Sequence, residues 1–225
     1  MKQIKISKIV AFDLDGTLLD SANDLIHSLN LLLLEQSQKT ISKNKINHLV
    51  GNGALAMIKE AYKLNKRKKE GIDWETLRLR FLEIYKEEFL NESTLFPYTK
   101  RTLQNLYKNN IKMVIVSNKP QFFVKKILKH FDINQYFSAV SGGDTFKYRK
   151  PDPRHLIKTI EKIKVNKYKC CFVGDSINDA LCAQNADVKL ILLRHGYSLK
   201  SVDIMGADIV LPDLKDLESK IYDLI

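Results

Sequence analysis

Four short segments of the sequence carry residue types that can do chemistry. They are Asp13-Leu14-Asp15-Gly16-Thr17, Ser117-Asn118-Lys119-Pro120, Lys150-Pro151 and Gly174-Asp175-Ser176-Ile177-Asn178-Asp179. Carboxylates that lie close together repel one another and need a cation. Because these segments offer hard oxygen donors and neither His nor Cys, they favour Mg²⁺ over zinc or copper. We therefore expect a magnesium site built from aspartates.

The remaining polar groups of these segments suit a phosphoryl group. Ser117 supplies a hydroxyl, and a helix expected to begin just after it points backbone N–H groups at an anion. Lys150 adds a fixed positive charge, and we expect it to be a catalytic residue together with Asp13 and Asp15. A metal ion, a lysine, a hydroxyl and a helix N-terminus together are typical of phosphoryl transfer, where catalysis consists of positioning and charge stabilisation.

Asp13 and Asp15 have separate roles in this interpretation. An ionised carboxylate at Asp13, in line with phosphorus, can form an aspartyl-phosphate and so split one hard step into two. Asp15 would protonate the leaving oxygen and later act as base for the attacking water. Its backbone carbonyl could also bind the metal ion. Gly16 lets the chain turn sharply out of the strand without a Cβ penalty.

Four apolar runs must position these residues. Each is short, lacks polar alternation and is rich in β-branched or bulky residues, as expected of parallel strands buried on both faces. The runs are Ile9-Val10-Ala11-Phe12, Met113-Val114-Ile115-Val116, Cys170-Cys171-Phe172-Val173 and Leu190-Ile191-Leu192-Leu193. Helical segments such as 121–131 and 153–163 separate most of them, which predicts an open α/β sheet covered by helices. Because the carboxyl ends of parallel strands meet at one edge, we expect Asp13, Asp15, Ser117 and Asp175 to converge.

The interval between the first two runs is helical in pattern and has no convincing strand. Ser21 and Asp24 resemble a capping box, and Asp73 opens a second helix. About eighty residues are too many for a simple crossover, whose usual length is roughly a dozen. We therefore expect a Rossmann-like core at 1–15 and 98–225 with an inserted all-helical cap domain at 16–97; the alternative is one long excursion packed on the sheet.

Taken together, the four segments resemble, in the right order, the signature motifs of the haloacid dehalogenase (HAD) superfamily. The resemblance implies a Rossmann-like core, a helical cap inserted after the first motif, and Mg²⁺. It implies that Asp13 is nucleophile and metal ligand, Asp15 is acid/base and carbonyl ligand, and Asp175 is a metal ligand supported by Asp179. It also implies a set of residues that hold the phosphoryl group, namely Gly16, Thr17, Ser117, Asn118 and Lys150.

Within the superfamily, the motifs resemble most those of the phosphoglycolate phosphatases, which implies 2-phosphoglycolate as substrate. Dehalogenases resembling the founding member lack an acid at the position of Asp15, and the membrane ATPases carry Thr there. Pyrophosphate, sugar phosphates and nucleoside monophosphates remain alternative substrates, and a β-phosphoglucomutase-like phosphomutase shares much of the pattern. A non-catalytic protein that binds anions or nucleic acid is the alternative from another functional class.

The composition of the sequence limits which partners and which cellular compartment we expect. The 225 residues are 44% hydrophobic and contain no run near the roughly 20 apolar residues of a membrane helix. Met1 to Lys8 lacks the features of a signal peptide. Cys170, Cys171 and Cys182 are expected to be structural thiols. These features predict a cytoplasmic protein without a membrane partner, and we expect a monomer or a homodimer.

The net charge of +11 does not by itself indicate nucleic-acid binding. The richest basic cluster, at residues 66–69, has no interleaved aromatics and is expected to be a solvated face or loop. A small phosphorylated metabolite is the expected partner, and no nucleic acid is expected. Gly51-Asn52-Gly53 is either a plain turn or a cap loop that closes over the substrate. Arg194 faces either the active-site edge or the surface. The five histidines show no metal-ligand spacing and are expected in the core or in solvent.

Overall fold

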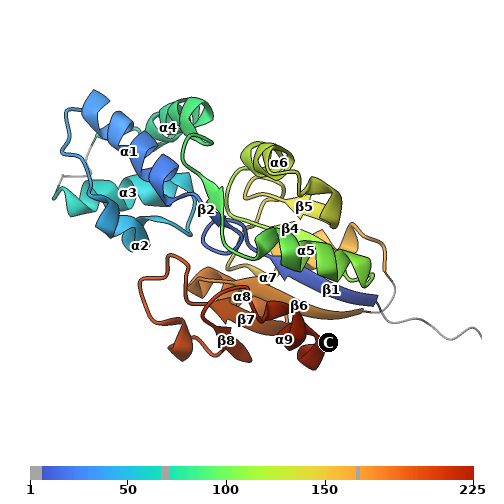
Figure 1. The fold of residues 1–225 in the computed structure, drawn as a ribbon. Helices are drawn as coiled ribbons and strands as arrows, with labels where there is room; N and C mark the ends of the chain where they lie inside the picture. Colours follow the sequence, from blue (N-terminus) through green and yellow to red (C-terminus); the bar gives the residue numbers. More distant parts are fainter. Residues whose placement is uncertain (1–6, 67–70, 166–167) are drawn as a thin grey trace, which may run out of the picture.

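The computed structural model of the chain describes residues 7–66, 71–165 and 168–225 (Figure 1). Its main sheet has six parallel strands in the order β5-β4-β1-β6-β7-β8. The strands are β1 (Ser7–Phe12), β4 (Lys112–Val116), β5 (Phe137–Ser141), β6 (Tyr168–Gly174), β7 (Lys189–Leu193) and β8 (Ile209–Leu211). The four apolar runs lie in β1, β4, β6 and β7, which confirms the prediction of a parallel α/β sheet.

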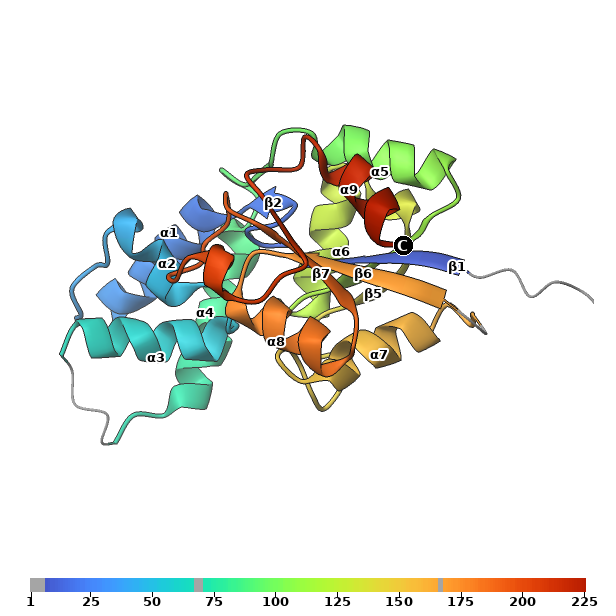
Figure 2. The ribbon, with the colours of Figure 1, turned by 90° about the horizontal axis from the view of Figure 1, so that it is seen from below.

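Helices cover both faces of this sheet (Figure 2). They are α5 (Thr99–Lys108), α6 (Gln121–His130), α7 (Pro153–Glu161), α8 (Ile177–Asn185) and α9 (Leu217–Leu224). Successive side chains of a strand point to opposite faces. Val10 and Phe12 therefore pack against α5, α6 and α9, whereas Ile9 and Ala11 pack against α7 and α8. Burial on both faces explains why β1 shows a continuous apolar run.

Four helices between β1 and β4 form a group beside the sheet (Figure 1). They are α1 (Ala22–Glu35), α2 (Ile46–Leu49), α3 (Ala54–Leu64) and α4 (Trp74–Glu88). The chain enters and leaves this group through an antiparallel pair, β2 (Leu19–Asp20) with β3 (Thr94–Leu95). The sequence reasoning expected no strand in this interval and missed this pair, since two-residue strands leave no periodicity. The division at 16–97 into core and cap domain stays a prediction. Single turns of 3₁₀ helix lie at Lys43–Lys45, Asn134–Tyr136 and Val202–Ile204.

The predicted starts of two helices had different outcomes. Asp73 caps α4, because its side chain accepts hydrogen bonds from the backbone N–H groups of residues 75 and 76. Helix α1 begins at the predicted place, but the capping box was wrong. Ser21 Oγ donates to Asp15 Oδ1 (2.6 Å), and Asp24 instead accepts from the N–H groups of Glu92 (2.8 Å) and Ser93 (2.9 Å). Asp24 thus holds the returning chain against α1.

Several smaller expectations can be compared with the structure. Cys170, Cys171 and Cys182 are buried and form no disulfide. Burial raises the pKa of Cys170 and of Cys182 to about 12, as expected of inert structural thiols. Most of the basic cluster, residues 67–69, lies outside the described residues. In the part of the chain that the structure describes, no helix has the length and apolar character needed to cross a bilayer.

Candidate active site

Three neighbouring strands bring the candidate residues to one edge of the sheet. Asp13 follows β1, Ser117 follows β4 and Asp175 follows β6, and β1 lies between the other two strands. The Asp13 N–H donates to the carbonyl of Val173 (3.0 Å), so the pairing of β1 with β6 continues to the point where Asp13 begins the loop. This register is what places residues more than 160 positions apart next to each other.

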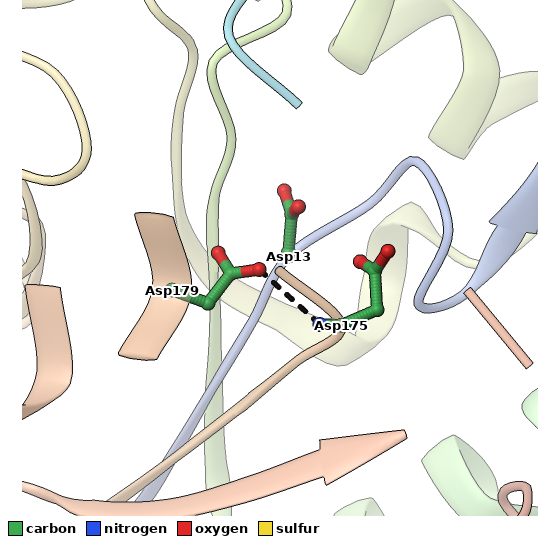
Figure 3. Close-up of side chains that lie close together, drawn as sticks. All are labelled: Asp13, Asp175 and Asp179. Carbon is green, nitrogen blue, oxygen red and sulfur yellow. Dashed lines mark hydrogen bonds between the residues drawn. The ribbon is translucent and has the colours of Figure 1, made fainter. Parts of the chain in front are cut away.

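Three aspartates form a buried acidic cluster at this edge (Figure 3). Asp13, Asp175 and Asp179 each offer a carboxylate oxygen, and these three atoms lie within 4.8 Å of one another. Lys150 is also buried, with its Nζ 2.8 Å from Asp13 Oδ1 and 2.6 Å from Asp179 Oδ1. One ammonium therefore faces three carboxylates, which leaves an excess of negative charge in a site shielded from water.

The pKa values of the cluster reflect this excess. Burial raises the pKa of Asp13 to about 7, with the charge of Asp179 adding to the rise and Lys150 opposing it. Burial, followed by the charges of Asp179 and Asp13, raises the pKa of Asp175 well above its usual value. Burial alone would lower the pKa of Lys150, but the two carboxylates beside it raise the pKa above its usual value. A cation among the carboxylates would favour their ionised forms.

The Asp175 carboxylate fits into a space that only glycine leaves open. A Cβ at Gly16 or at Gly196 would overlap this carboxylate, and Gly16 also adopts a φ of +86°. Thr17 Oγ1 donates to Asp175 Oδ1 (2.9 Å), and the Tyr197 N–H donates to Oδ2 (2.8 Å). The loops after β1 and β7, the two strands that flank β6, thus fix the orientation of this carboxylate.

Asp179 connects the acidic cluster to the start of α8. Its Oδ2 accepts from the N–H groups of Ser176 (3.0 Å) and Asp175 (3.2 Å) and from Ser176 Oγ (2.6 Å). Its Oδ1 contacts Lys150. Asp179 is therefore both a helix-start residue and a member of the acidic cluster, so that it orients Asp175 and Lys150 together.

The cluster has the donor chemistry of a site for a hard divalent cation. All three groups are carboxylates, and neither His nor Cys accompanies them among the described residues. Asp13 Oδ1 is buried and lies 2.8 Å from the Lys150 ammonium. One ammonium does not offset three buried carboxylates, so the cluster favours a further cation. The residues present therefore fit Mg²⁺.

Asp15 points away from the acidic cluster. Both of its carboxylate oxygens accept hydrogen bonds from Lys119 Nζ, at 2.9 and 3.0 Å, and Oδ1 also accepts from Ser21. The sequence reasoning did not assign Lys119 a role. Its position directly after Ser117 and Asn118, at the end of a buried strand, was the signal that could have found it.

Asn118 tethers the glycine loop to the sheet edge. Its Nδ2 donates to the carbonyls of Lys150 (3.0 Å) and Gly51 (3.0 Å). Asn178 Nδ2 donates to the same Gly51 carbonyl (3.1 Å) and to Asn52 Oδ1 (2.9 Å). Gly51-Asn52-Gly53 is thus more than a plain turn, because Asn118 after β4 and Asn178 at the start of α8 both hold it over the edge.

A cavity lies between the helices and the edge of the sheet. Its polar side comprises Asp13, Asp15, Ser117, Asn118 and Lys119. Its opposite side is mostly apolar and includes Leu25, Leu49, Met57, Phe81 and Tyr85 from the helices. A second cavity, on the side of Asp175 and Asn178, also reaches Asp13 and Asp15. The two acids that follow β1 are therefore accessible from both sides of the glycine loop.

Comparison with known proteins shows to which family this chain belongs. A family model described as haloacid dehalogenase-like hydrolase matches residues 10–193, which is most of the sequence. The chain belongs to this family. A relative named phosphoglycolate phosphatase from Agrobacterium fabrum is 36% identical over 218 residues, covering 97% of this chain and 94% of the relative. Another of the same name, from Photorhabdus laumondii, is 37% identical over 221 residues, covering 98% and 94%.

Solved structures agree with this assignment. A predicted phosphoglycolate phosphatase from Haemophilus somnus has a TM-score of 0.87 at 29% identity, covering 95% of this chain and 97% of that one. The resemblance to the HAD superfamily is thereby confirmed, and this haloacid dehalogenase-like hydrolase is a phosphatase.

Three of the predicted residues have other contacts in this hydrolase. Arg194 is exposed and pairs with Asp203, so it belongs to the surface. The Gly16 N–H donates to the carbonyl of Leu19, and the Thr17 N–H donates to that of Leu14. With the Thr17 hydroxyl on Asp175, these two residues shape the turn after Asp13. Their contact with a phosphoryl group stays a prediction.

Proposed function

We propose that this hydrolase cleaves a small phosphomonoester, 2-phosphoglycolate, with Asp13 as nucleophile and Mg²⁺ as cofactor. The observation that carries the proposal is the position of Asp13. It is buried at the end of the central strand, in contact with Lys150, inside an acidic cluster, and it lines the cavity that Asp15 and Ser117 also line. A nucleophile, a proton donor, a cation site and a binding cavity thus share one location.

The residues present would hold the metal ion on the acidic side of Asp13. Asp13 and Asp175 would supply carboxylate oxygens and Asp15 its backbone carbonyl, with Asp179 fixing the loop that carries Asp175. When bound, Mg²⁺ supplies charge stabilisation for the phosphoryl oxygens and offsets the repulsion among the aspartates. Ser117, which lines the cavity, and Lys150, which contacts Asp13, would hold the phosphoryl oxygens.

Two displacement steps complete the reaction. In the first, a carboxylate oxygen of Asp13 attacks phosphorus, the bond to the glycolate oxygen breaks, and Asp15 delivers a proton to that oxygen. In the second, water attacks the phosphorus of the aspartyl-phosphate while Asp15 takes the proton from the water. Inorganic phosphate leaves and the Asp13 carboxylate is restored. Lys119 and Ser21, which bind the Asp15 carboxylate, orient it for both proton transfers.

The choice of 2-phosphoglycolate as substrate is supported by the names of the relatives and by the apolar lining of the cavity. Phosphoglycolate phosphatase is the printed name of the relatives in Agrobacterium fabrum and Photorhabdus laumondii. The apolar side of the cavity suits a small leaving group better than a polyhydroxylated sugar, whose hydroxyls would lack partners there. Pyrophosphate, sugar phosphates and nucleoside monophosphates are the competing substrates. A phosphomutase would yield a rephosphorylated sugar instead of free phosphate.

Phosphate release across these substrates, with and without Mg²⁺, tests the proposal. We expect a strong preference for 2-phosphoglycolate that depends on Mg²⁺. Asp13→Asn should lower kcat by at least about 10⁴-fold, because the amide is no nucleophile. Asp203→Asn, which removes an exposed carboxylate that pairs with Arg194 and lines neither cavity, serves as the control and should keep full activity. Retained Mg²⁺-dependent activity in Asp13→Asn would overturn the mechanism, and a preference for another substrate would overturn the assignment to 2-phosphoglycolate.

A further inference from the structure

Lys119 is the one basic side chain that lines the cavity beside Asp13, within the part of the chain that the structure describes. The other charged groups of the lining are the acids Asp13 and Asp15. Lys150, on the far side of Asp13, contacts the acidic cluster and does not line this cavity. If a ligand in this cavity carries a second anionic group besides its phosphoryl group, Lys119 is the cation of the lining that could bind it.

The ammonium of Lys119 is deeply buried, and its known contacts leave part of its donor capacity unused. Its Nζ donates to both oxygens of Asp15 and lies over the ring of Tyr85, 4.7 Å from the centroid. An ammonium carries three N–H donors. In surroundings of low polarity, a charge-assisted hydrogen bond from this group is stronger than one at the surface.

Tyr85 provides a second indication of a ligand. Its side chain is 2% exposed and lines the same cavity, and its hydroxyl lies near the Lys119 ammonium but has no partner in good hydrogen-bond geometry among the described residues. Buried polar groups nearly always have partners, and one left without a partner costs free energy. Burial raises the pKa of Tyr85 to about 12, so the hydroxyl keeps its proton and can donate. The ring is held by stacking on Phe81 and an edge contact with Phe123, which fixes where the hydroxyl lies.

We propose that the Lys119 ammonium and the Tyr85 hydroxyl together bind the carboxylate of the substrate. The inference rests on the proposed function and extends it to a substrate class, the phosphomonoesters of 2-hydroxycarboxylates. In such esters one carbon separates the carboxylate from the leaving oxygen. Asp15 must reach that oxygen to protonate it, and Lys119 Nζ lies 2.9 Å from Asp15. The ammonium is therefore within reach of a carboxylate one carbon further on.

The two groups come from different parts of the fold, which has a consequence for selectivity. Lys119 follows β4, whereas Tyr85 lies in α4 of the helical group. A carboxylate bound between them would hold the helices and the sheet edge together around the substrate. A neutral group at the same place would leave Lys119 without a new partner and the Tyr85 hydroxyl unpaired. Discrimination against substrates that lack the carboxylate follows from these unpaired groups.

A matched pair of substrates tests the proposal. 2-Phosphoglycolate and 2-hydroxyethyl phosphate differ only in the replacement of the carboxylate by a hydroxymethyl group. Lys119→Met should lower kcat/KM for 2-phosphoglycolate by at least about 30-fold more than for 2-hydroxyethyl phosphate, as expected for one charge-assisted hydrogen bond. Tyr85→Phe, which keeps the ring packing, should shift the same ratio by about 5-fold. Lys126→Met removes an exposed charge from α6 and should leave the ratio unchanged.

Binding gives a second readout that does not depend on turnover. 3-Phosphonopropionate replaces the bridging oxygen of 2-phosphoglycolate by a methylene group, and propylphosphonate is its partner without the carboxylate. Calorimetry should show that the wild-type protein prefers 3-phosphonopropionate and that Lys119→Met abolishes this preference. An equal preference in both proteins would overturn the proposal.

The kinetic outcomes separate the proposal from the function on which it rests. An equal fall for both substrates in Lys119→Met would mean that Lys119 only positions Asp15, and the proposal would be wrong while the phosphatase activity stands. Equal hydrolysis of both substrates by the wild-type enzyme would refute both the carboxylate site and 2-phosphoglycolate as substrate. If the enzyme hydrolyses neither substrate and calorimetry shows no preference for 3-phosphonopropionate, both the proposed function and the carboxylate site are refuted.

Discussion

His155 should make the stability of this protein depend on pH in a way that one substitution removes. The side chain lies in α7 and is fully buried, and neither ring nitrogen has a partner in good hydrogen-bond geometry among the described residues. Burial, helped by the charges of Lys150 and Lys162, lowers the pKa of His155 to about 3, with the backbone of Gly142 and the charge of Asp152 opposing. The native state therefore holds the neutral imidazole.

The size of the effect follows from proton linkage. In the unfolded chain the pKa of histidine is about 6.5, so below this pH the unfolded state binds a proton that the native state does not. The contribution of the neutral, buried His155 to the free energy of unfolding is fully present above about pH 6.5 and is lost as the pH falls towards 3. Since each pH unit in this window corresponds to about 1.4 kcal/mol, we expect a loss of about 2 kcal/mol at pH 5.

Urea unfolding followed by circular dichroism, at about pH 8 and pH 5, measures this term. His155→Leu removes the titrating group. The carboxylates and the other histidines remain in both proteins, so their contributions cancel in the comparison. The free energy of unfolding of the wild type should fall by about 2 kcal/mol more than that of the variant. Equal pH dependence in the two proteins would refute the reasoning that His155 is held neutral.

Three further predictions concern two loops beside the acidic cluster and the contact that Asp24 makes with the returning chain. Gly196→Ala places a methyl group against Asp175 and should raise the Mg²⁺ concentration needed for half-maximal activity and lower kcat by about 10²-fold; wild-type Mg²⁺ dependence would show that the crowding is harmless. Asn178→Ala removes a hydrogen bond to Gly51 and should raise KM by about 5-fold in steady-state assays, with an unchanged KM counting against a role of the loop in binding. Asp24→Ala removes the acceptor that holds the returning chain and should lower the free energy of unfolding by about 3 kcal/mol in urea; a change below 1 kcal/mol would contradict this.

The sequence was informative where a strand is buried on both faces. The runs in β1, β4, β6 and β7 were found because no polar alternation interrupts them. β5 was missed, since it lies at the sheet edge and Ser138 is exposed on it. β8 was missed because three residues are too few to show a period. The strand order, which no local pattern reveals, is what brings Asp13 between Ser117 and Asp175.

The parts of the site that sequence reasoning missed depend on contacts across the fold. The Lys119–Asp15 pair joins residues 104 positions apart. Tyr85 of α4 lines the same cavity as residues that follow β1 and β4, a neighbourhood that depends on how the helical group lies beside the sheet. The motifs predicted which side chains follow each strand, but they could not predict which of those side chains would pair with one another. Asp15 accordingly lies against Lys119 instead of joining the acidic cluster.

Trapping the covalent intermediate tests the central claim most directly. The enzyme with Mg²⁺ would be mixed with 2-phosphoglycolate, quenched in acid within milliseconds, digested and analysed by mass spectrometry. The account predicts one added phosphoryl group on the peptide that contains Asp13, absent in Asp13→Asn and lost on the timescale of phosphate release. Phosphate release without any phosphorylated peptide, or a phosphoryl group on a residue other than Asp13, would contradict it.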